Sequence, residues 1–213
     1  MGREFTELFD EWSEHYDRTV AGEDEEYREV FDGYDRILEA VAERVSGVIV
    51  EFGVGTGNLT EKLLRRSDNI YGIEPSEGMR TQVLKRGLPI VLLDGDFLEF
   101  PAVPEPIDAI VSTYAFHHLT DEEKERAIAL YSRLLQPGGR IVFADTAFAS
   151  AEDRLEIEQS AERAGFVNLL QDLRTEYYTS LTVLNKLFTE HRFAVSFTRL
   201  NRYVWLMEAV KQG

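Results

Sequence analysis

Five short apolar runs, separated by helical stretches, constrain the fold of this chain more than any other feature. The runs occupy residues 48–52, 70–74, 90–96, 109–116 and 140–148. Their short length and β-branched residues are typical of strands that are buried on both faces. Helices are expected between them, at residues 58–66, 76–86 and 121–135. Alternation of this kind indicates a parallel sheet built from βαβ units.

The last third of the chain follows a different pattern. Two helical stretches, at about 151–164 and 180–191, precede two strand-like runs at 193–200 and 202–210. The gap around Asn201 is too short for a parallel crossover, so the two runs are expected to form an antiparallel hairpin. The sequence therefore predicts an α/β fold: a seven-stranded, mostly parallel sheet with a C-terminal antiparallel hairpin and helices on both faces.

Two amphipathic helices are predicted before the first strand, at residues 4–17 and about 25–44. Their apolar residues recur at helical spacing: Phe5, Leu8, Phe9, Trp12 and Tyr16, then Tyr27, Val30, Phe31, Tyr34, Ile37, Leu38 and Val41. Residues 1–32 also hold twelve Asp or Glu and only three Arg. We interpret this acidic segment as a solvated helix face.

The overall composition argues against several classes of partner. The chain carries 39 Asp and Glu against 23 Lys and Arg, a formal net charge of −16. Phosphate backbones and anionic lipid repel such a chain, so neither nucleic acid nor a membrane is expected as its main partner. The chain has no cysteine, which excludes thiolate metal sites and cysteine nucleophiles. Because we find neither a signal peptide nor the ~20 apolar residues of a membrane span, we expect a soluble, cytoplasmic protein.

A glycine-rich stretch follows the first predicted strand. Residues 49–60 read IVEFGVGTGNLT, with glycines at positions 53, 55 and 57. The dinucleotide fingerprint G-x-G-x-x-G requires its third glycine at position 58, which is Asn58 here. Glu51 stands two residues before the first glycine. A carboxylate there repels a pyrophosphate but attracts a ligand that carries an ammonium and a sulfonium.

The motif E-x-G-x-G-x-G, which begins at Glu51, resembles the first motif of class I S-adenosylmethionine (SAM)-dependent methyltransferases. This resemblance implies that SAM is the cofactor. It implies that the loop of Gly53, Gly55 and Gly57 passes under the methionine part of SAM, and that Glu51 helps to hold its amino group through water.

Landmarks further along the chain extend the resemblance. Glu74 ends the second predicted strand, 19 residues after Gly55, where an acid can accept hydrogen bonds from both ribose hydroxyls. Residues 107–119 resemble the family's fourth motif, and residues 134–143 resemble its turn into the fifth strand. The resemblance covers about residues 45–150, and the C-terminal hairpin agrees with the family's extra antiparallel strand.

The sequence LLDGDF, at residues 92–97, resembles the third motif of the family. By this match Asp96 accepts a hydrogen bond from the adenine amino group, and the backbone amide of Phe97 lies beside the ring. Asp94 is the alternative, although it is better placed as a turn acid. Met79 is expected to be a core residue of its helix, with a contact to adenine as the alternative.

The resemblance also implies how the chain is divided. It predicts one Rossmann-like methyltransferase domain over residues 1–213. Within it, residues 1–44 form N-terminal helices and a lid, residues 45–148 form the SAM-binding core, and residues 149–213 form an acceptor-side insert and the terminal hairpin.

One residue of the predicted lid is a candidate for the cofactor site. Trp12, Tyr16 and Asp17 match a W-x-x-x-Y-D pattern found at the start of small-molecule members of the family. This match implies that the Tyr16 hydroxyl closes over the SAM carboxylate. A plain packing role for Tyr16 remains open.

Methyl transfer requires alignment of the acceptor and exclusion of water, and it requires a general base only if the acceptor must lose a proton. The candidates for that base are His117 and His118, in YAFHHLT, because a histidine titrates near neutral pH. The alternative for both is a structural role or substrate positioning. Tyr114 and, more weakly, Asp145 are further candidates at the same edge of the sheet. No metal site is expected, because the other two histidines are scattered and no H-x-x-x-H spacing occurs.

The predicted function is SAM-dependent methyl transfer to an unidentified small molecule, by a monomer or homodimer. Residues 1–44 and about 149–192 are expected to surround the acceptor, and the candidates for its pocket are Phe5, Phe9, Trp12, Tyr177 and Tyr178. Two alternatives remain at this stage: an NAD(P)-dependent oxidoreductase on a similar sheet, and a regulatory protein that binds SAM without catalysis.

Overall fold

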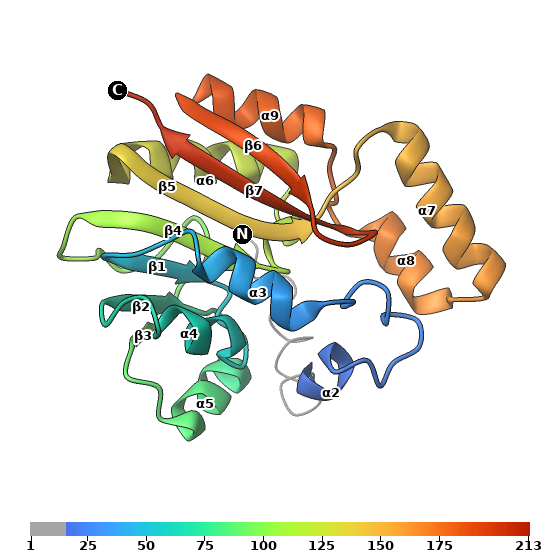
Figure 1. Cartoon of the computed structure of the whole chain (residues 1–213), viewed down its shortest axis with the longest axis horizontal. Coiled ribbons are helices and arrows are strands. Elements are labelled where there is room, and N and C mark those ends of the chain that lie inside the picture. The colour runs from blue at the N-terminus through green and yellow to red at the C-terminus, as the bar shows by residue number, and fades with distance from the viewer. Residues whose placement is uncertain (1–15) are drawn as a thin grey trace.

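A computed structural model describes residues 16–213 of the chain, which are arranged around one sheet (Figure 1). The strands lie in the order β3-β2-β1-β4-β5-β7-β6. Strands β1 to β5 pair in parallel, whereas β7 pairs antiparallel with both β5 and β6. The strands are β1 (Ile49–Phe52), β2 (Ile70–Ile73), β3 (Val91–Leu93), β4 (Ile107–Thr113), β5 (Leu135–Thr146), β6 (Phe193–Arg199) and β7 (Val204–Lys211). The predicted fold, five parallel strands and an added antiparallel hairpin, is therefore confirmed.

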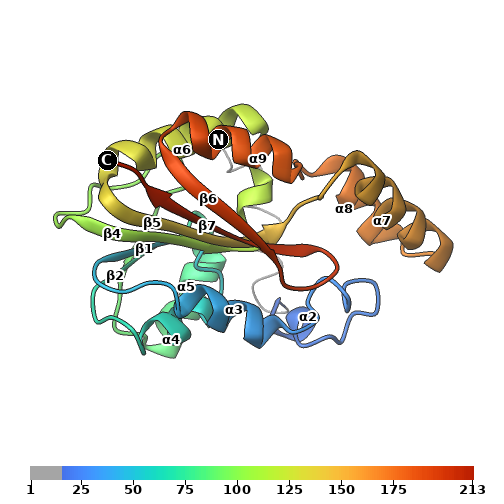
Figure 2. The same ribbon diagram turned by 45° about the horizontal axis from the view of Figure 1, so that its top comes forward.

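Helices cover both faces of the sheet, as Figure 2 shows. One face carries α3 (Tyr34–Ala42), α4 (Asn58–Leu63) and α5 (Glu77–Arg86), and the other carries α6 (Asp121–Leu134) and α9 (Leu181–Glu190). The remaining helices, α2 (Tyr16–Val20), α7 (Ala151–Ala164) and α8 (Val167–Thr175), lie on the side toward which β5 points (Figure 1). They therefore flank the edge of the sheet where the parallel strands end.

The apolar runs are continuous because the central strands are buried on both faces. Ile49 of β1 packs in one core cluster with Leu38 of α3, and Val50, the next residue, packs in a second cluster with Ile128 and Tyr131 of α6. Successive side chains of a strand point to opposite faces, so a strand covered on both sides has no polar face to show in its sequence.

The predicted helix at residues 25–44 is wrong in its first half. Residues 21–33 run through turns, and α3 begins at Tyr34. Gly33 immediately before it has a φ of 72°, a left-handed conformation that cannot continue a right-handed helix. The turns bring Tyr27 to α8, where its hydroxyl donates a hydrogen bond to Asp172. The earlier predicted helix, at residues 4–17, and with it Phe5, Phe9 and Trp12, lies almost wholly outside the described residues.

The segment between β5 and β6 holds three helices where the sequence predicts two. The helix that was missed is α8, and it buries Leu169 and Leu173. A left-handed glycine, Gly165, ends α7, and only Phe166 separates it from the start of α8. The break at Gly165 and Phe166 is at the short end of helix connections, so no loop-like stretch in the sequence separates the two helices.

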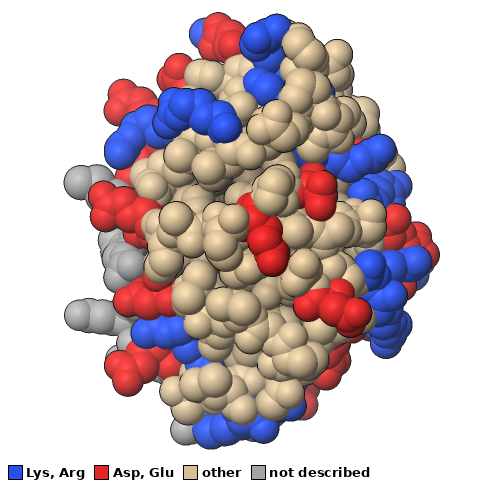
Figure 3. All heavy atoms as spheres, turned by 90° about the vertical axis from the view of Figure 1, so that its left-hand side faces the viewer, with Lys and Arg blue, Asp and Glu red and all other residues tan. Residues whose placement is uncertain are grey.

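The described surface carries both signs of charge. On the face in Figure 3, which is the left-hand side of Figure 1, acidic and basic side chains are interspersed around a largely uncharged centre. This face does not present the continuous basic patch that binds phosphate backbones. Within residues 16–213, no helix has both the length and the apolar character needed to cross a membrane.

Replacing Leu38 with alanine tests the packing of α3 on the sheet. Leu38 is 2% exposed, so Leu38→Ala is expected to lower the free energy of unfolding by about 2–5 kcal/mol in urea titrations. Leu84→Ala on α5 is the control, because Leu84 is 70% exposed and its truncation is expected to cost no more than about 0.5 kcal/mol. Equal losses in the two variants would contradict the described packing.

Candidate active site

The glycine loop joins β1 to α4 at the carboxyl end of the sheet. Gly53 has a φ of 66°, and a Cβ placed on it would come within 2.8 Å of the Cβ of Ala115. Its backbone N–H donates to the carbonyl of Ile73 on the neighbouring strand β2. Gly55 and Gly57 also have positive φ, and Gly57 caps α4. The loop therefore stays close to the sheet and leaves its outer side open at Gly55.

Glu51 is a buried acid on β1 beneath this loop, 1% exposed. Its Oε2 accepts a hydrogen bond of 2.7 Å from Thr60, whereas its buried Oε1 has no partner. Burial raises the pKa of Glu51 to about 8, opposed by the Thr60 hydrogen bond and reinforced by the charge of Glu74. An unsatisfied carboxylate oxygen in a buried position is suited to a ligand that carries a positive charge. This observation fits the ammonium group of SAM.

The acids that follow β2 and β3 lie near the same loop. Glu74 accepts hydrogen bonds of 2.9 Å from the backbone N–H groups of both Gly55 and Ser76. Asp96 follows β3, and its Oδ1 accepts hydrogen bonds from the backbone N–H groups of Leu98 and Glu99. The predicted third strand therefore ends earlier, at Leu93, so that Asp96 belongs to a turn.

A first cavity collects most of the predicted cofactor residues. It is lined by Tyr16, Gly53, Gly55, Glu74, Pro75, Met79, Asp96, Phe97, Thr113, Tyr114, Ala115 and His118. Its volume is about 70 Å³, well below the ~300 Å³ of the smallest ordinary ligand pockets. Glu74 and Gly55, which share a hydrogen bond, both line this cavity.

Helix α2 is attached to the glycine loop by Asp17. The Asp17 carboxylate accepts hydrogen bonds from Thr56 (2.7 Å) and from the Asn58 amide (3.0 Å). Arg86 of α5 donates to the backbone oxygen of Thr56 and to the side-chain oxygen of Asn58. Asn58, the residue that breaks the dinucleotide fingerprint, thus links α2, the loop and α5.

His117 follows β4 and is held by an acid at the end of β5. Its Nδ1 lies 2.6 Å from Asp145, whose other oxygen accepts the backbone N–H of His117. The opposite ring nitrogen, Nε2, lies 3.4 Å from Glu176, and the ring stacks on Tyr178. Burial lowers the pKa of His117, but the charge and hydrogen bond of Asp145, with Glu176, outweigh burial and raise that pKa above its usual value.

His118 lies beside His117, with 4.0 Å between the ring centres. Burial, together with the neighbouring His117 and Lys124, lowers the pKa of His118 well below its usual value, so its imidazole is neutral at physiological pH. Burial lowers the pKa of Lys124 as well, to about 8, and its ammonium donates to the backbone oxygens of Leu119 and Tyr177.

Glu176 adds a third potential metal ligand to His117 and His118. Atoms of His117, His118 and Glu176 that can bind a metal all lie within 4.8 Å of one another. No motif in the sequence marks this cluster, because Glu176 is the C-cap of α8 and lies 59 positions from His117. The sequence-based expectation that there is no metal site stays a prediction.

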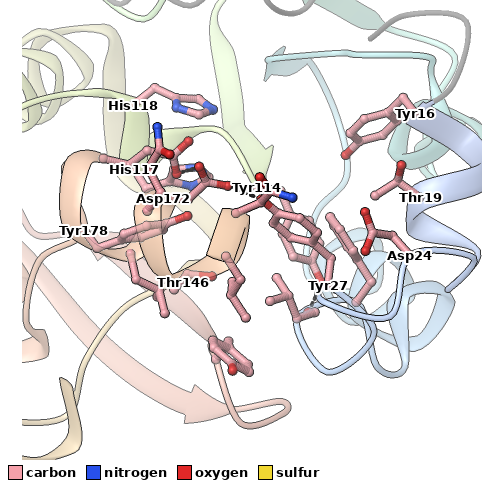
Figure 4. A pocket seen from close by; sticks show the side chains of 18 residues that line it. Tyr16, Thr19, Asp24, Tyr27, Tyr114, His117, His118, Thr146, Asp172 and Tyr178 are labelled. Carbon is pink, nitrogen blue, oxygen red and sulfur yellow. Dashed lines mark hydrogen bonds and ion pairs between the residues drawn. The ribbon is translucent and has the colours of Figure 1, made fainter. Parts of the chain in front are cut away.

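A second cavity, of about 510 Å³, opens beside the first. Figure 4 shows Tyr16, Thr19 and Asp24 on one side of it, and His117, His118, Asp172 and Tyr178 on the other, with Tyr114 between them. Tyr16, Tyr114 and His118 line both cavities. Tyr114 is one of two described non-glycine residues with positive φ, here 53°, a conformation that costs about 1–3 kcal/mol and concentrates at functional sites.

Comparison with known proteins identifies the family. A family model described as a methyltransferase domain matches residues 49–139. An uncharacterized methyltransferase of Geobacillus kaustophilus is 58% identical over 213 residues, with 100% of this chain and 99% of the relative covered. The chain belongs to the class I SAM-dependent methyltransferases. Its cofactor is SAM, and the comparisons support a SAM-dependent methyltransferase over the alternative of an NAD(P)-dependent oxidoreductase.

Solved structures show the same methyltransferase fold at low sequence identity. Magnesium protoporphyrin IX methyltransferase from Synechocystis, with bound S-adenosylhomocysteine (SAH), has a TM-score of 0.71 at 14% identity, with 97% of this chain and 98% of that chain covered. The DhpI–SAH complex has a TM-score of 0.72 at 17% identity, with coverage of 97% and 95%.

The predicted site residues of this methyltransferase fall into three groups. Six of them line the first cavity: Tyr16, Gly53, Gly55, Glu74, Asp96 and Phe97. Glu51 and Gly57 do not line it, and His117 lines the second cavity, whereas His118 lines both. Tyr178 lines the second cavity as expected, but Tyr177 does not and is 38% exposed. Asp94 is exposed and lies 3.5 Å from Arg80.

Glu51 gives this methyltransferase a specific pH dependence of stability. Because the pKa of Glu51 is raised on folding, its contribution to stability is full below the unfolded pKa, near 4.5, and is lost as the pH rises through about 8. Glu51→Gln removes this loss, so the variant without ligand is expected to be more stable than the parent at pH 8 by roughly 2–4 kcal/mol.

Urea unfolding at pH 5 and pH 8 measures this difference, and Glu99→Gln serves as the control, because Glu99 is exposed. A Glu51→Gln variant that loses as much stability between the two pH values as the parent protein would show that Glu51 is not the group responsible.

Proposed function

We propose that this methyltransferase transfers the methyl group of SAM to a small molecule that is held in the second cavity. The observation that supports this assignment is the shared boundary of the two cavities at Tyr16, Tyr114 and His118. With SAM in the first cavity, the methyl group reaches an acceptor in the second through that boundary. The volume of about 510 Å³ lies in the range of pockets for small molecules.

We assign the cofactor contacts from the family's motifs and from the chemistry of these side chains. Glu51 holds the amino group of SAM through water, and Gly53, Gly55 and Gly57 pass under its methionine part. Glu74 accepts hydrogen bonds from the ribose hydroxyls, Asp96 from the adenine amino group, and the Phe97 amide lies beside the ring. Tyr16 closes over the SAM carboxylate from α2.

The protein's part in the reaction is to align the acceptor, to exclude water and to receive a proton where the acceptor has one to lose. SAM supplies an activated methyl group on a sulfonium. His118 is the group we assign as the proton acceptor, because it lines both cavities and can pass a proton on to solvent in the second. His117 is fixed by Asp145 and positions the wall of the second cavity.

The larger organisation follows from the same assignment. One domain spans residues 1–213, with a lid in residues 1–44, the SAM-binding core in residues 45–148, and acceptor-side elements in residues 149–213. Its partner is neither nucleic acid nor a membrane, its location is the cytoplasm, and it acts as a monomer or homodimer. The strongly negative net charge supports the first of these points.

Ligand-dependent melting tests the cofactor site. SAM or SAH at about 100 times its dissociation constant adds ~2.7 kcal/mol to the stability, a rise in Tm of roughly 5–10 °C for a domain of this size. NAD and NADP at the same concentrations are the controls and are expected to leave Tm unchanged. The assignment fails if SAM and SAH have no effect.

Substitutions at two nearby acids distinguish a specific contact with adenine from a general effect of charge. Asp96→Asn retains an oxygen for the turn but replaces a charged acceptor, so the dissociation constant for SAH in titration calorimetry is expected to rise about 10-fold or more. Asp94→Asn is the control, because Asp94 is exposed and lies outside the cavity. A larger loss in Asp94→Asn than in Asp96→Asn would move the adenine contact to Asp94.

A further inference from the structure

The second cavity carries an excess of acidic side chains. Three carboxylates line it: Asp24 after α2, Asp172 on α8, and Glu176 at the end of α8. Neither lysine nor arginine is present among the described residues of its wall. An acceptor that carries a carboxylate or phosphate would therefore meet repulsion and find no cationic partner in this wall.

The histidines of the wall do not balance these acids. His117 lies between two carboxylates, with Nδ1 2.6 Å from Asp145 and Nε2 3.4 Å from Glu176, so one positive charge on its ring faces two negative charges. His118 is neutral, because burial and its cationic neighbours lower its pKa. Burial raises the pKa of Glu176, and the negative charge of Asp172 raises it further, although His117 and a hydrogen bond from Tyr178 act in the opposite direction. A cation bound between these carboxylates would relieve their repulsion.

Aromatic rings surround the carboxylates. Six line the cavity: Tyr16, Tyr27, Phe31, Tyr114, Tyr178 and Tyr203. Aromatic faces attract organic cations, and cages of several rings are the usual way in which proteins bind alkylated ammonium groups. Carboxylates and aromatic rings in one pocket thus favour the same kind of ligand.

One of the acids lies beside the boundary where the methyl group crosses. The carboxylate of Glu176 is within 4.8 Å of ring nitrogens of both His117 and His118, and His118 lines both cavities. A positively charged group that contacts Glu176 is therefore next to the position from which it can be methylated. The nitrogen that carries the positive charge is therefore placed to be the atom that is methylated, once it has lost a proton.

We propose that the acceptor is an organic amine, bound as a cation by Asp172 and Glu176 and methylated on its nitrogen. This inference rests on the proposed function. The ammonium form first loses one proton to solvent by way of His118, which lines both cavities, and this loss restores the lone pair on nitrogen. That lone pair forms the new bond to the methyl carbon while the carbon–sulfur bond breaks, and both electrons of the broken bond remain on sulfur. SAM becomes SAH, and the positive charge moves from sulfur to the methylated nitrogen.

A set of isosteric ligands tests this proposal with the whole protein saturated with SAH. Choline carries a quaternary ammonium group, 3,3-dimethyl-1-butanol is its neutral isostere, and 3,3-dimethylbutanoate is an anionic relative. Titration calorimetry is expected to give a dissociation constant for choline at least 10-fold lower than for the other two. The proposal is overturned if the neutral or anionic compound binds as well as choline.

Substitutions in the cavity identify the groups that bind the cation. Asp172→Asn and Glu176→Gln together are expected to weaken choline binding 10-fold or more while leaving SAH affinity and Tm within a few degrees of the parent protein. Glu156→Gln on α7, which is exposed and outside the cavity, is the matched control and is expected to change nothing. Choline affinity that is unchanged in the double variant overturns the proposal, provided that the variant still binds SAH.

An assay of SAH formation distinguishes a failure of this inference from a failure of the proposed function on which it rests. SAH formation from SAM is expected with a panel of primary and secondary alkyl and arylalkyl amines, and to continue in excess EDTA. Failure of SAM and SAH to bind would refute the proposed function. Binding of SAM with turnover only on alcohols, phenols or carboxylates would refute the amine alone. Turnover that EDTA abolishes and Zn²⁺ restores would show that Glu176 and the histidines hold a metal, which also refutes the amine contact.

Discussion

The parallel pairing of β1 with both β2 and β4 is the constraint on which the site depends. Since the strand order reverses direction at β1, the connections after β1 and β4 diverge to opposite faces and leave a crevice at the carboxyl edge of the sheet. Each contributing segment enters this crevice directly after a strand: the glycine loop after β1, Glu74 after β2, Asp96 after β3, and the histidines after β4. Asp145, near the end of β5, fixes His117 from the next strand along.

The site residues that directly follow a strand could be predicted from the sequence. A buried parallel strand appears as a continuous apolar run, and the residue after it falls at the binding edge, so Glu74 and the glycine loop could be placed there from the pattern. The family resemblance favoured Asp96 over Asp94 for the adenine contact, and the structure leaves Asp94 exposed. Met79, interpreted as a core residue, is both buried and part of the first cavity.

The residues that line the second cavity could not be predicted from the sequence, because tertiary contacts bring them together from distant segments. Tyr27 faces the cavity because Gly33 breaks the predicted helix, and the apolar periodicity around it continues through that break. Asp172 lies on α8 and Glu176 is its C-cap, and this helix was not predicted because only a short break at Gly165 separates it from α7. On a helix, an acid normally indicates a solvated face, so nothing in their local sequence distinguishes these two from the many other acids of the chain. Their excess charge becomes visible only when the walls are assembled.

The two hydrogen bonds that Asp17 accepts from the glycine loop join the cofactor side to the acceptor side. Asp17 and Tyr16 are neighbours on α2, and Tyr16 lines both cavities. A ligand that shifts the loop therefore shifts the wall against which the other ligand rests. Thermodynamic reciprocity then sets a symmetrical rule: whatever factor SAM imposes on the affinity for the acceptor, the acceptor imposes on the affinity for SAM. In such an arrangement the short α2 helix acts as a coupling element as well as a cover.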